Sequence, residues 1–105
     1  MVNEFVAGSG NIFADLGINN PELELAKAEL AHAIRSIIRE RKLTQKQAAS
    51  VLGTDQAKVS ALMGGKVSGY SYDRLVHYLN KLNYDVRIVL SPSSLDRSGK
   101  TLVEK

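Results

Sequence analysis

The sequence contains no cysteine, only two prolines and no long apolar segment. Without cysteine there can be no disulfide bond, thiolate metal site or cysteine nucleophile, and this composition is typical of a reducing compartment. No stretch approaches the ~20 apolar residues that a membrane-spanning helix needs, and the first residues lack the pattern of a signal peptide. We therefore expect a cytoplasmic protein with no membrane partner.

The charge of the chain is unevenly distributed over its 105 residues, a length that suits one domain with one hydrophobic core. Residues 1–30 contain one Lys and five acidic residues, whereas residues 31–105 contain thirteen Lys or Arg and six acidic residues. The basic part therefore carries a net charge of +7 and is where an anionic partner would bind.

Capping residues and apolar periodicity predict four helices. The first lies within residues 19–42, with Asn20 as its cap and Pro21 at its first helical position. The second helix is Gln45–Leu52, capped by Thr44. The third is Asp55–Met63, capped by Thr54 and ended by Gly64 and Gly65. The fourth is Tyr72–Leu82, capped by Ser71, and its expected buried residues are Leu75, Val76, Leu79 and Leu82. We expect Gly53 to adopt the positive φ of a tight turn.

Residues 84–90 have the alternating pattern of a β-strand, which Pro92 ends. The sequence offers no evident partner for this strand within the chain. Because unpaired strand edges are unfavourable, we expect the same strand of a second copy to pair with it across a two-fold axis. The predicted dimer interface consists of Tyr84, Val86, Ile88 and Leu90. The predicted organisation is a flexible arm (1–20), one domain (21–90) and a mobile tail (91–105).

Two short helices joined by a glycine-containing turn are typical of a helix-turn-helix motif. Ala49 lies where the two helices would cross closely, and Gly53 makes the turn. Leu52, Val59 and Leu62 would face the core from both helices. The remaining face of the second helix of the motif could then enter the major groove of DNA.

The outward positions of that helix have chemistry suited to base edges. Gln56 can contact adenine, alanine methyls can contact the thymine methyl, and an exposed Asp can accept from cytosine. The predicted base contacts are Asp55, Gln56, Ala57, Ser60 and Ala61. The predicted phosphate contacts are Thr44, Gln45, Lys46, Thr54, Lys58 and Lys66, at helix starts or with positive charge.

The stretch "LTQKQAASVLGTDQAKVSALMGGK" resembles the Cro/phage-repressor-like, or XRE, helix-turn-helix regulators. The resemblance covers about residues 21–90 and implies an all-α, lambda-repressor-like helix-turn-helix bundle with a C-terminal β-strand able to pair across a dimer. It also implies that Gln45 binds phosphate and that Asp55, Gln56, Ala57 and Ala61 face bases. Ala57 departs from the glutamine often found at its position in phage repressors.

The order of the predicted elements is similar to that of HigA-type antitoxins. This resemblance implies a homodimeric transcriptional repressor that binds a palindromic operator in double-stranded DNA, controls its own type II toxin-antitoxin operon and neutralises a RelE/HigB-like toxin. The acidic residues 1–30 would suit such a basic partner. The alternative is a protein-interaction module, toxin-binding or adaptor, that keeps the helix-turn-helix fold as a scaffold.

Several residues near the predicted DNA face can be explained without a contact to DNA. Asp55 can stabilise the positive end of a helix rather than contact a base, and the arginines 35, 39 and 41 can be solvated or paired. Tyr70 and Tyr72 can reach phosphate or pack across the loop before the fourth helix. No catalytic pair or metal-ligand cluster can be assembled from the sequence, so we expect neither an enzyme nor a small-molecule substrate, cofactor or metal.

Overall fold

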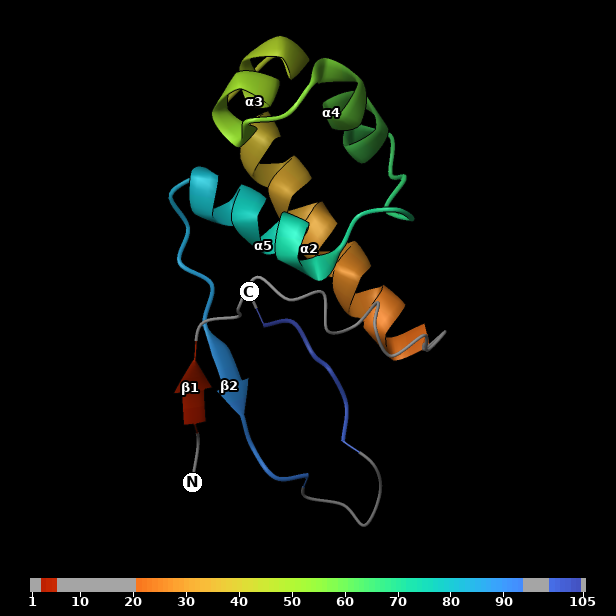
Figure 1. Cartoon of the computed structure of the whole chain (residues 1–105), viewed down its shortest axis with the longest axis vertical. Coiled ribbons are helices and arrows are strands. Elements are labelled where there is room, and N and C mark those ends of the chain that lie inside the picture. Colours follow the sequence, from red (N-terminus) through yellow and green to blue (C-terminus); the bar gives the residue numbers. More distant parts are fainter. Residues whose placement is uncertain (1–2, 6–20, 94–98, 105) are drawn as a thin grey trace.

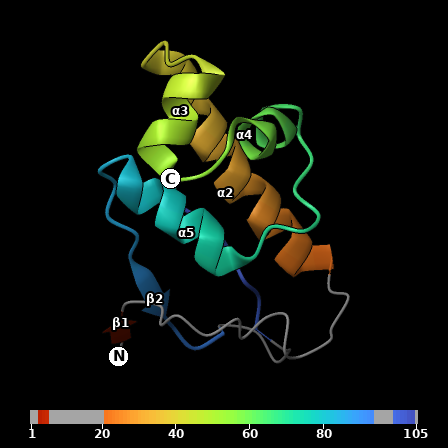
Figure 2. The same cartoon turned by 45° about the horizontal axis from the view of Figure 1, so that its top comes forward.

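The computed structural model describes residues 3–5, 21–93 and 99–104. In this part of the chain the helices are α2 (Pro21–Glu40), α3 (Gln45–Leu52), α4 (Gln56–Met63) and α5 (Tyr72–Lys81), and the strands are β1 (Asn3–Phe5) and β2 (Ile88–Leu90). Figures 1 and 2 show α3 and α4 next to one another at one end of the molecule, with the two strands at the other end. The predicted fold class, a helical helix-turn-helix bundle with a C-terminal strand, is confirmed.

Helix α2 forms one side of the core because its apolar residues recur at three- and four-residue steps. Ile34 and Ile38 are fully buried, Ala26 and Ile37 are buried, and Leu30 packs against the edge of the cluster. The helix packs against α5 and α4. It begins at Pro21 as predicted but ends at Glu40, two residues before the predicted end.

All four helices end with the same backbone arrangement, the Schellman motif. A residue with positive φ follows each helix, and the next N–H donates to the carbonyl five residues earlier. The donors and acceptors are Leu43 to Ile38 (3.1 Å), Thr54 to Ala49 (3.0 Å), Lys66 to Ala61 (3.0 Å) and Tyr84 to Leu79 (2.9 Å). The positive-φ residues are Lys42 (54°), Gly53 (72°), Gly65 (86°) and Asn83 (68°), which confirms the prediction for Gly53.

The core joins all four helices and holds the motif to the longer helices. Its largest fully buried side chains are Ile34, Ile38, Leu52, Val59, Leu62, Leu75 and Leu82. Ala49, predicted at the helix crossing, is buried, and Ala48 beside it has no exposed surface. Leu75, Leu79 and Leu82 are buried as predicted, whereas Val76 is only half-buried; Tyr78 of the same helix is also buried.

The C-terminal strand differs from the prediction in length and in partner. It spans Ile88–Leu90 rather than residues 84–90, and it pairs with β1 of the same chain in antiparallel register, with Asn3 opposite Leu90 and Phe5 opposite Ile88. The expectation that this strand has no partner within the chain was therefore wrong. The strand starts late because the Tyr84 amide still donates to the Leu79 carbonyl at the end of α5 and Val86 packs against the core.

The predicted flexible arm overlaps β1, but residues 6–20 lie outside the described residues. In the predicted tail, residues 91–93 and 99–104 form neither helix nor strand. Within the described ranges, no helix combines the length and the apolar character needed to cross a membrane.

Candidate nucleic-acid interface

The turn between α3 and α4 consists of three residues, Gly53 to Asp55. The positive φ of Gly53 lets the chain reverse immediately after Leu52. A Cβ at this position would meet nothing within 4 Å, so the backbone conformation alone demands glycine. The short turn fixes the two helices in contact, with Leu52, Val59 and Leu62 beneath them.

The start of α3 is closed by a capping box, of which the sequence predicts only the cap at Thr44. The Gln47 amide donates to the Thr44 hydroxyl (3.0 Å), and the Thr44 amide donates to Oε1 of Gln47 (2.9 Å). The amides of Gln45 and Lys46 lie in the same first turn, where a helix has no internal acceptor for them. Thr44, Gln45 and Lys46 are all exposed, so this turn can accept an anion.

The start of α4 is capped by Asp55, and the prediction that Thr54 caps it was wrong. Oδ1 of Asp55 accepts from the Lys58 amide at 2.8 Å, three residues further on, which is the spacing that capping requires. The helix therefore begins at Gln56 rather than Asp55. Oδ2 of Asp55 lies 3.8 Å from Nζ of Lys58, and both side chains are well exposed. The helix-stabilising explanation of Asp55 thus has a specific hydrogen bond behind it.

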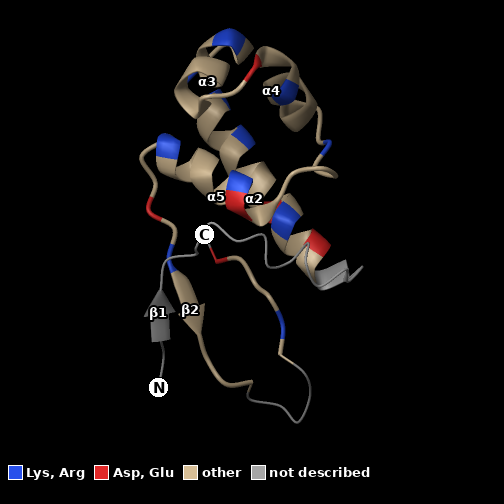
Figure 3. Cartoon of the chain, in the orientation of Figure 1, with Lys and Arg blue, Asp and Glu red and all other residues tan. Residues whose placement is uncertain are grey.

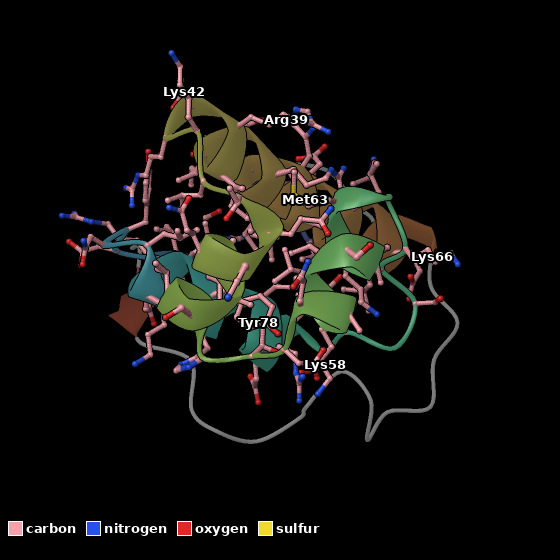
Figure 4. The ribbon with its side chains drawn as sticks, turned by 90° about the horizontal axis from the view of Figure 1, so that it is seen from above. Arg39, Lys42, Lys58, Met63, Lys66 and Tyr78 are labelled. Carbon is pink, nitrogen blue, oxygen red and sulfur yellow. The ribbon has the colours of Figure 1, made fainter. Side chains whose placement is uncertain are left out.

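The outer face of α4 contains the residues that the sequence predicted there. Gln56, Ala57, Lys58 and Ser60 are exposed and Ala61 is half-buried, while Val59 and Leu62 point into the core. In Figure 4, which looks onto this end of the molecule, Lys58 lies at the lower edge, Lys66 at the right edge, and Arg39 and Lys42 towards the upper edge. Thr54 is half-buried in the turn. The structure therefore brings the predicted base and phosphate residues to one end of the molecule.

Positive charge is spread around this end. Figure 3 shows Lys and Arg segments on α3, on α4 and after α4, with an acidic segment where α4 begins. Lys46, Lys58 and Lys66 are exposed, as the phosphate prediction requires. The Asp55–Lys58 pair does not immobilise Lys58, because exposed ion pairs contribute little free energy.

Two arginines predicted as solvated or paired donate to backbone carbonyls at helix ends. Nη1 of Arg35 donates to the Leu62 carbonyl of α4 (3.3 Å), and Nη2 of Arg41 donates to the Leu82 carbonyl after α5 (2.7 Å). The guanidinium of Arg41 also lies 5.9 Å from the centre of the Tyr84 ring. These contacts link residues 27 and 41 positions apart, so no local pattern could have revealed them.

The tyrosines near α5 pack within the protein. The Tyr70 hydroxyl donates to the Lys58 carbonyl of α4, and its ring meets that of Tyr78 edge-on, with centroids 6.4 Å apart. Burial raises the pKa of the hydroxyls of Tyr70 and Tyr72. Packing across the loop, one of the two explanations offered from the sequence, is therefore what Tyr70 does.

The residues predicted for a dimer interface differ in their exposure. Leu90 and Tyr84 are exposed, Ile88 is half-buried, and Val86 packs against the core of its own chain. Tyr84 is held by Arg41 and by Asn80, whose Nδ2 donates to the Tyr84 carbonyl at 3.0 Å. The exposed apolar surface of the strand region is thus centred on Val89 and Leu90.

Comparisons with known proteins agree with this architecture. A family model described as a helix-turn-helix domain matches residues 12–91. A solved structure assigned to the XRE family of transcriptional regulators is similar to the chain, with 38% sequence identity, a TM-score of 0.69, and coverage of 75% of this chain and 89% of that one. No curated protein matches significantly.

The chain belongs to the XRE family of helix-turn-helix proteins. This confirms the family predicted from the stretch "LTQKQAASVLGTDQAKVSALMGGK". XRE proteins are regulators rather than enzymes, which also confirms the prediction that the chain is not an enzyme. Among the described residues, no three His, Asp or Glu side chains are grouped so that they could hold a metal ion.

Proposed function

We propose that the chain is a sequence-specific DNA-binding transcriptional repressor that places α4 in the major groove. The observation that carries this proposal is the division of α4 into two faces: Val59 and Leu62 are buried, while Gln56, Lys58 and Ser60 are exposed beside the open start of α3. Membership of the XRE family supports the same function.

Base recognition would come from the start and outer face of α4. The exposed amide of Gln56 has a donor and an acceptor that match adenine, and Ala57 and Ala61 offer methyl groups to thymine. Ser60 adds a hydroxyl. Asp55 has one oxygen engaged with the Lys58 amide, so only its other oxygen could accept from cytosine.

Phosphate contacts would position the protein without specifying sequence. The first turn of α3 supplies the amides of Gln45 and Lys46 together with the Thr44 hydroxyl and the Lys46 ammonium. Thr54, Lys58 and Lys66 would contact the backbone flanking α4. These contacts would make binding steeply dependent on salt concentration.

A homodimer would place two α4 helices in successive major grooves of a palindromic operator, about 34 Å apart. In the described residues one edge of β2 pairs with β1 and nothing pairs with the other edge. That free edge, with Val89 51% and Leu90 49% exposed, suits the same strand of a second copy. Two paired copies would then build a four-stranded sheet in the order β1, β2, β2, β1.

The dimer has its own test. Leu90→Lys places a charge at the proposed junction and should shift the protein from dimer to monomer in sedimentation. Leu25→Lys is the matched control, because Leu25 is an exposed leucine (61%) on α2, away from β2. A Leu90→Lys protein that still sediments as a dimer would remove β2 from the interface.

We further propose that the repressor is a cytoplasmic antitoxin whose partner is a RelE/HigB-like toxin. The HigA-like order of its elements and the acidic character of residues 1–30 support this role. The test is inhibition: the protein should suppress the ribonuclease activity of a toxin encoded beside it. Full ribonuclease activity in the mixture would refute the antitoxin role and leave DNA binding standing.

The test of DNA binding is a titration of the protein against its own upstream duplex and a scrambled duplex at two salt concentrations. The chain offers a matched pair, since Gln45 and Gln56 are the first residues of α3 and α4. Gln56→Ala should cost about 1–3 kcal/mol on the upstream duplex and little on the scrambled one. Gln45→Ala should weaken both duplexes alike, because it contacts phosphate.

Each outcome of the titration decides something. Equal losses for Gln56→Ala on both duplexes would remove Gln56 from base recognition. Wild-type protein that binds neither duplex would refute DNA binding and favour the alternative function, a protein-interaction module that keeps the motif as scaffold.

A further inference from the structure

Two side chains from outside α4 bond to the backbone of α4. The hydroxyl of Tyr70, in the loop before α5, donates to the Lys58 carbonyl, and the guanidinium of Arg35, in α2, donates to the Leu62 carbonyl. These carbonyls are four residues apart, so they lie one turn apart along the same edge of the helix. Two anchors on one edge restrict the rotation of α4 about its own axis.

This anchoring matters because α4 has only eight residues and only two side chains, Val59 and Leu62, that are buried. Met63 packs only partly against the core, and a short helix with so few apolar contacts can roll slightly without losing them. The exposed residues of the proposed DNA face, Gln56, Lys58 and Ser60, would move with any such roll. A bidentate contact from Gln56 to a base edge depends on that orientation, whereas a flexible lysine reaches phosphate over a range of positions.

We propose that Tyr70 is a positioning residue for DNA recognition, which fixes the orientation of α4 from the protein side together with Arg35. The proposal rests on the proposed function and deepens it: Tyr70 does not touch DNA, yet it sets how sharply the protein distinguishes its operator from other sequences. Phosphate binding, and hence the affinity for random DNA, is left largely unchanged by Tyr70.

Tyr78 provides an internal control for this inference. It is buried to a similar degree (3% exposed, against 8% for Tyr70), and the two rings meet edge-on. The hydroxyl of Tyr78 is buried without a hydrogen-bond partner among the described residues, so it does not anchor α4. Figure 4 shows Tyr78 beneath the motif, between α3 and α4. Removing either hydroxyl alters the same region of the core, but only the removal of the Tyr70 hydroxyl breaks a hydrogen bond to α4.

The experiment compares Tyr70→Phe with Tyr78→Phe in the full chain. For each variant, the affinities for the upstream and scrambled duplexes are measured, together with the salt dependence and the hydrogen exchange of the α4 amides. Tyr70→Phe should lower the ratio of the two affinities about three- to tenfold, the effect of one net hydrogen bond, with an unchanged salt slope. It should also speed exchange in α4. Tyr78→Phe should change neither the ratio nor the exchange.

The outcomes separate this inference from the proposed function. If the wild type prefers its upstream duplex and Tyr70→Phe keeps the full preference, the inference is overturned and DNA recognition stands. Equal effects of the two variants would also overturn it, because Tyr70 would then act only as part of the core. If the wild type binds neither duplex, the proposed function fails, and unchanged α4 exchange in Tyr70→Phe would show separately that Tyr70 does not anchor the helix.

Discussion

The two ends of the molecule are built in different ways. At the helix-turn-helix end, the capping and backbone hydrogen bonds that form α3 and α4 join residues three to five positions apart, such as Thr44 with Gln47 and Asp55 with Lys58. At the other end, the sheet pairs Asn3 with Leu90, across almost the whole chain. The first kind of contact leaves a pattern in the local sequence, and the second does not.

The two ends also differ in burial. Leu52, Val59 and Leu62 under the motif are at most 1% exposed, whereas Val89 and Leu90 in β2 are about half exposed. A two-stranded sheet of three residues per strand is marginal in water unless something covers it or extends it. The motif end is therefore stabilised by burial against α2 and α5, while the sheet end is suited to gain its stability from an additional strand.

The largest expected loss of stability tests this difference in burial between the two ends. Leu62→Ala removes a fully buried side chain between α4 and the core and should lower the free energy of unfolding by about 2–5 kcal/mol. Leu90→Ala, the same change in the exposed strand, should cost less than about 0.5 kcal/mol in the monomer. Urea denaturation of both variants at low protein concentration measures the difference. Comparable losses would mean that the sheet end contributes as much as the core.

The next largest loss of stability is expected in the turn between α3 and α4. Gly53→Ala forces an alanine to a φ of 72° and should cost about 1–2 kcal/mol, although its Cβ meets no atom within 4 Å. Gly64→Ala is the control, because Gly64 has a φ of −80° and its Cβ would contact the Ser60 carbonyl oxygen at an acceptable 3.4 Å. Thermal unfolding of the pair measures this difference. A tolerated Gly53→Ala would contradict the strain argument.

Helix capping gives a smaller effect at the same end. Asp55→Ala removes the cap of α4 and should cost about 1 kcal/mol, whereas Asp55→Asn keeps an acceptor for the Lys58 amide and should cost much less. Chemical denaturation of the two variants distinguishes the hydrogen bond from the charge. Equal losses in both would assign the stabilising effect to the negative charge near the helix start rather than to the cap.

The same contrast explains what could be predicted from the sequence. The bounds of α3, the cap at Ser71, the turn at Gly53 and the buried Leu52, Val59 and Leu62 all follow from local spacing. The cap of α4 was misplaced by one residue because Thr54 and Asp55 are both good capping residues and only the geometry selects between them. The two candidates are neighbours in the sequence, but their capping propensities alone do not show which of them caps the helix.

The long-range contacts could not be predicted. The pairing of β1 with β2 and the hydrogen bonds from Arg35, Arg41 and Tyr70 to distant carbonyls depend on the assembled fold. A carbonyl acceptor is present at every residue, so the sequence carries no sign of which one a given side chain reaches. The exposure of the predicted DNA face follows from helical spacing alone: Gln56, Lys58 and Ser60 lie exposed as expected and Ala61 is half-buried, while the base contacts remain predictions that the titration tests.

The smallest expected effect concerns the end of α2. Lys42 adopts a φ of 54°, a conformation that costs most residues about 1–2 kcal/mol but glycine little. Glycine loses more conformational entropy on folding, by about 0.5–1 kcal/mol, so Lys42→Gly should stabilise the protein by roughly 0.5 kcal/mol. Asn83 takes the same position after α5, with a φ of 68°, and Asn83→Gly should gain less, because asparagine tolerates this conformation. A loss of stability in Lys42→Gly, measured by thermal unfolding, would mean that the Lys42 side chain contributes more than its backbone strain costs.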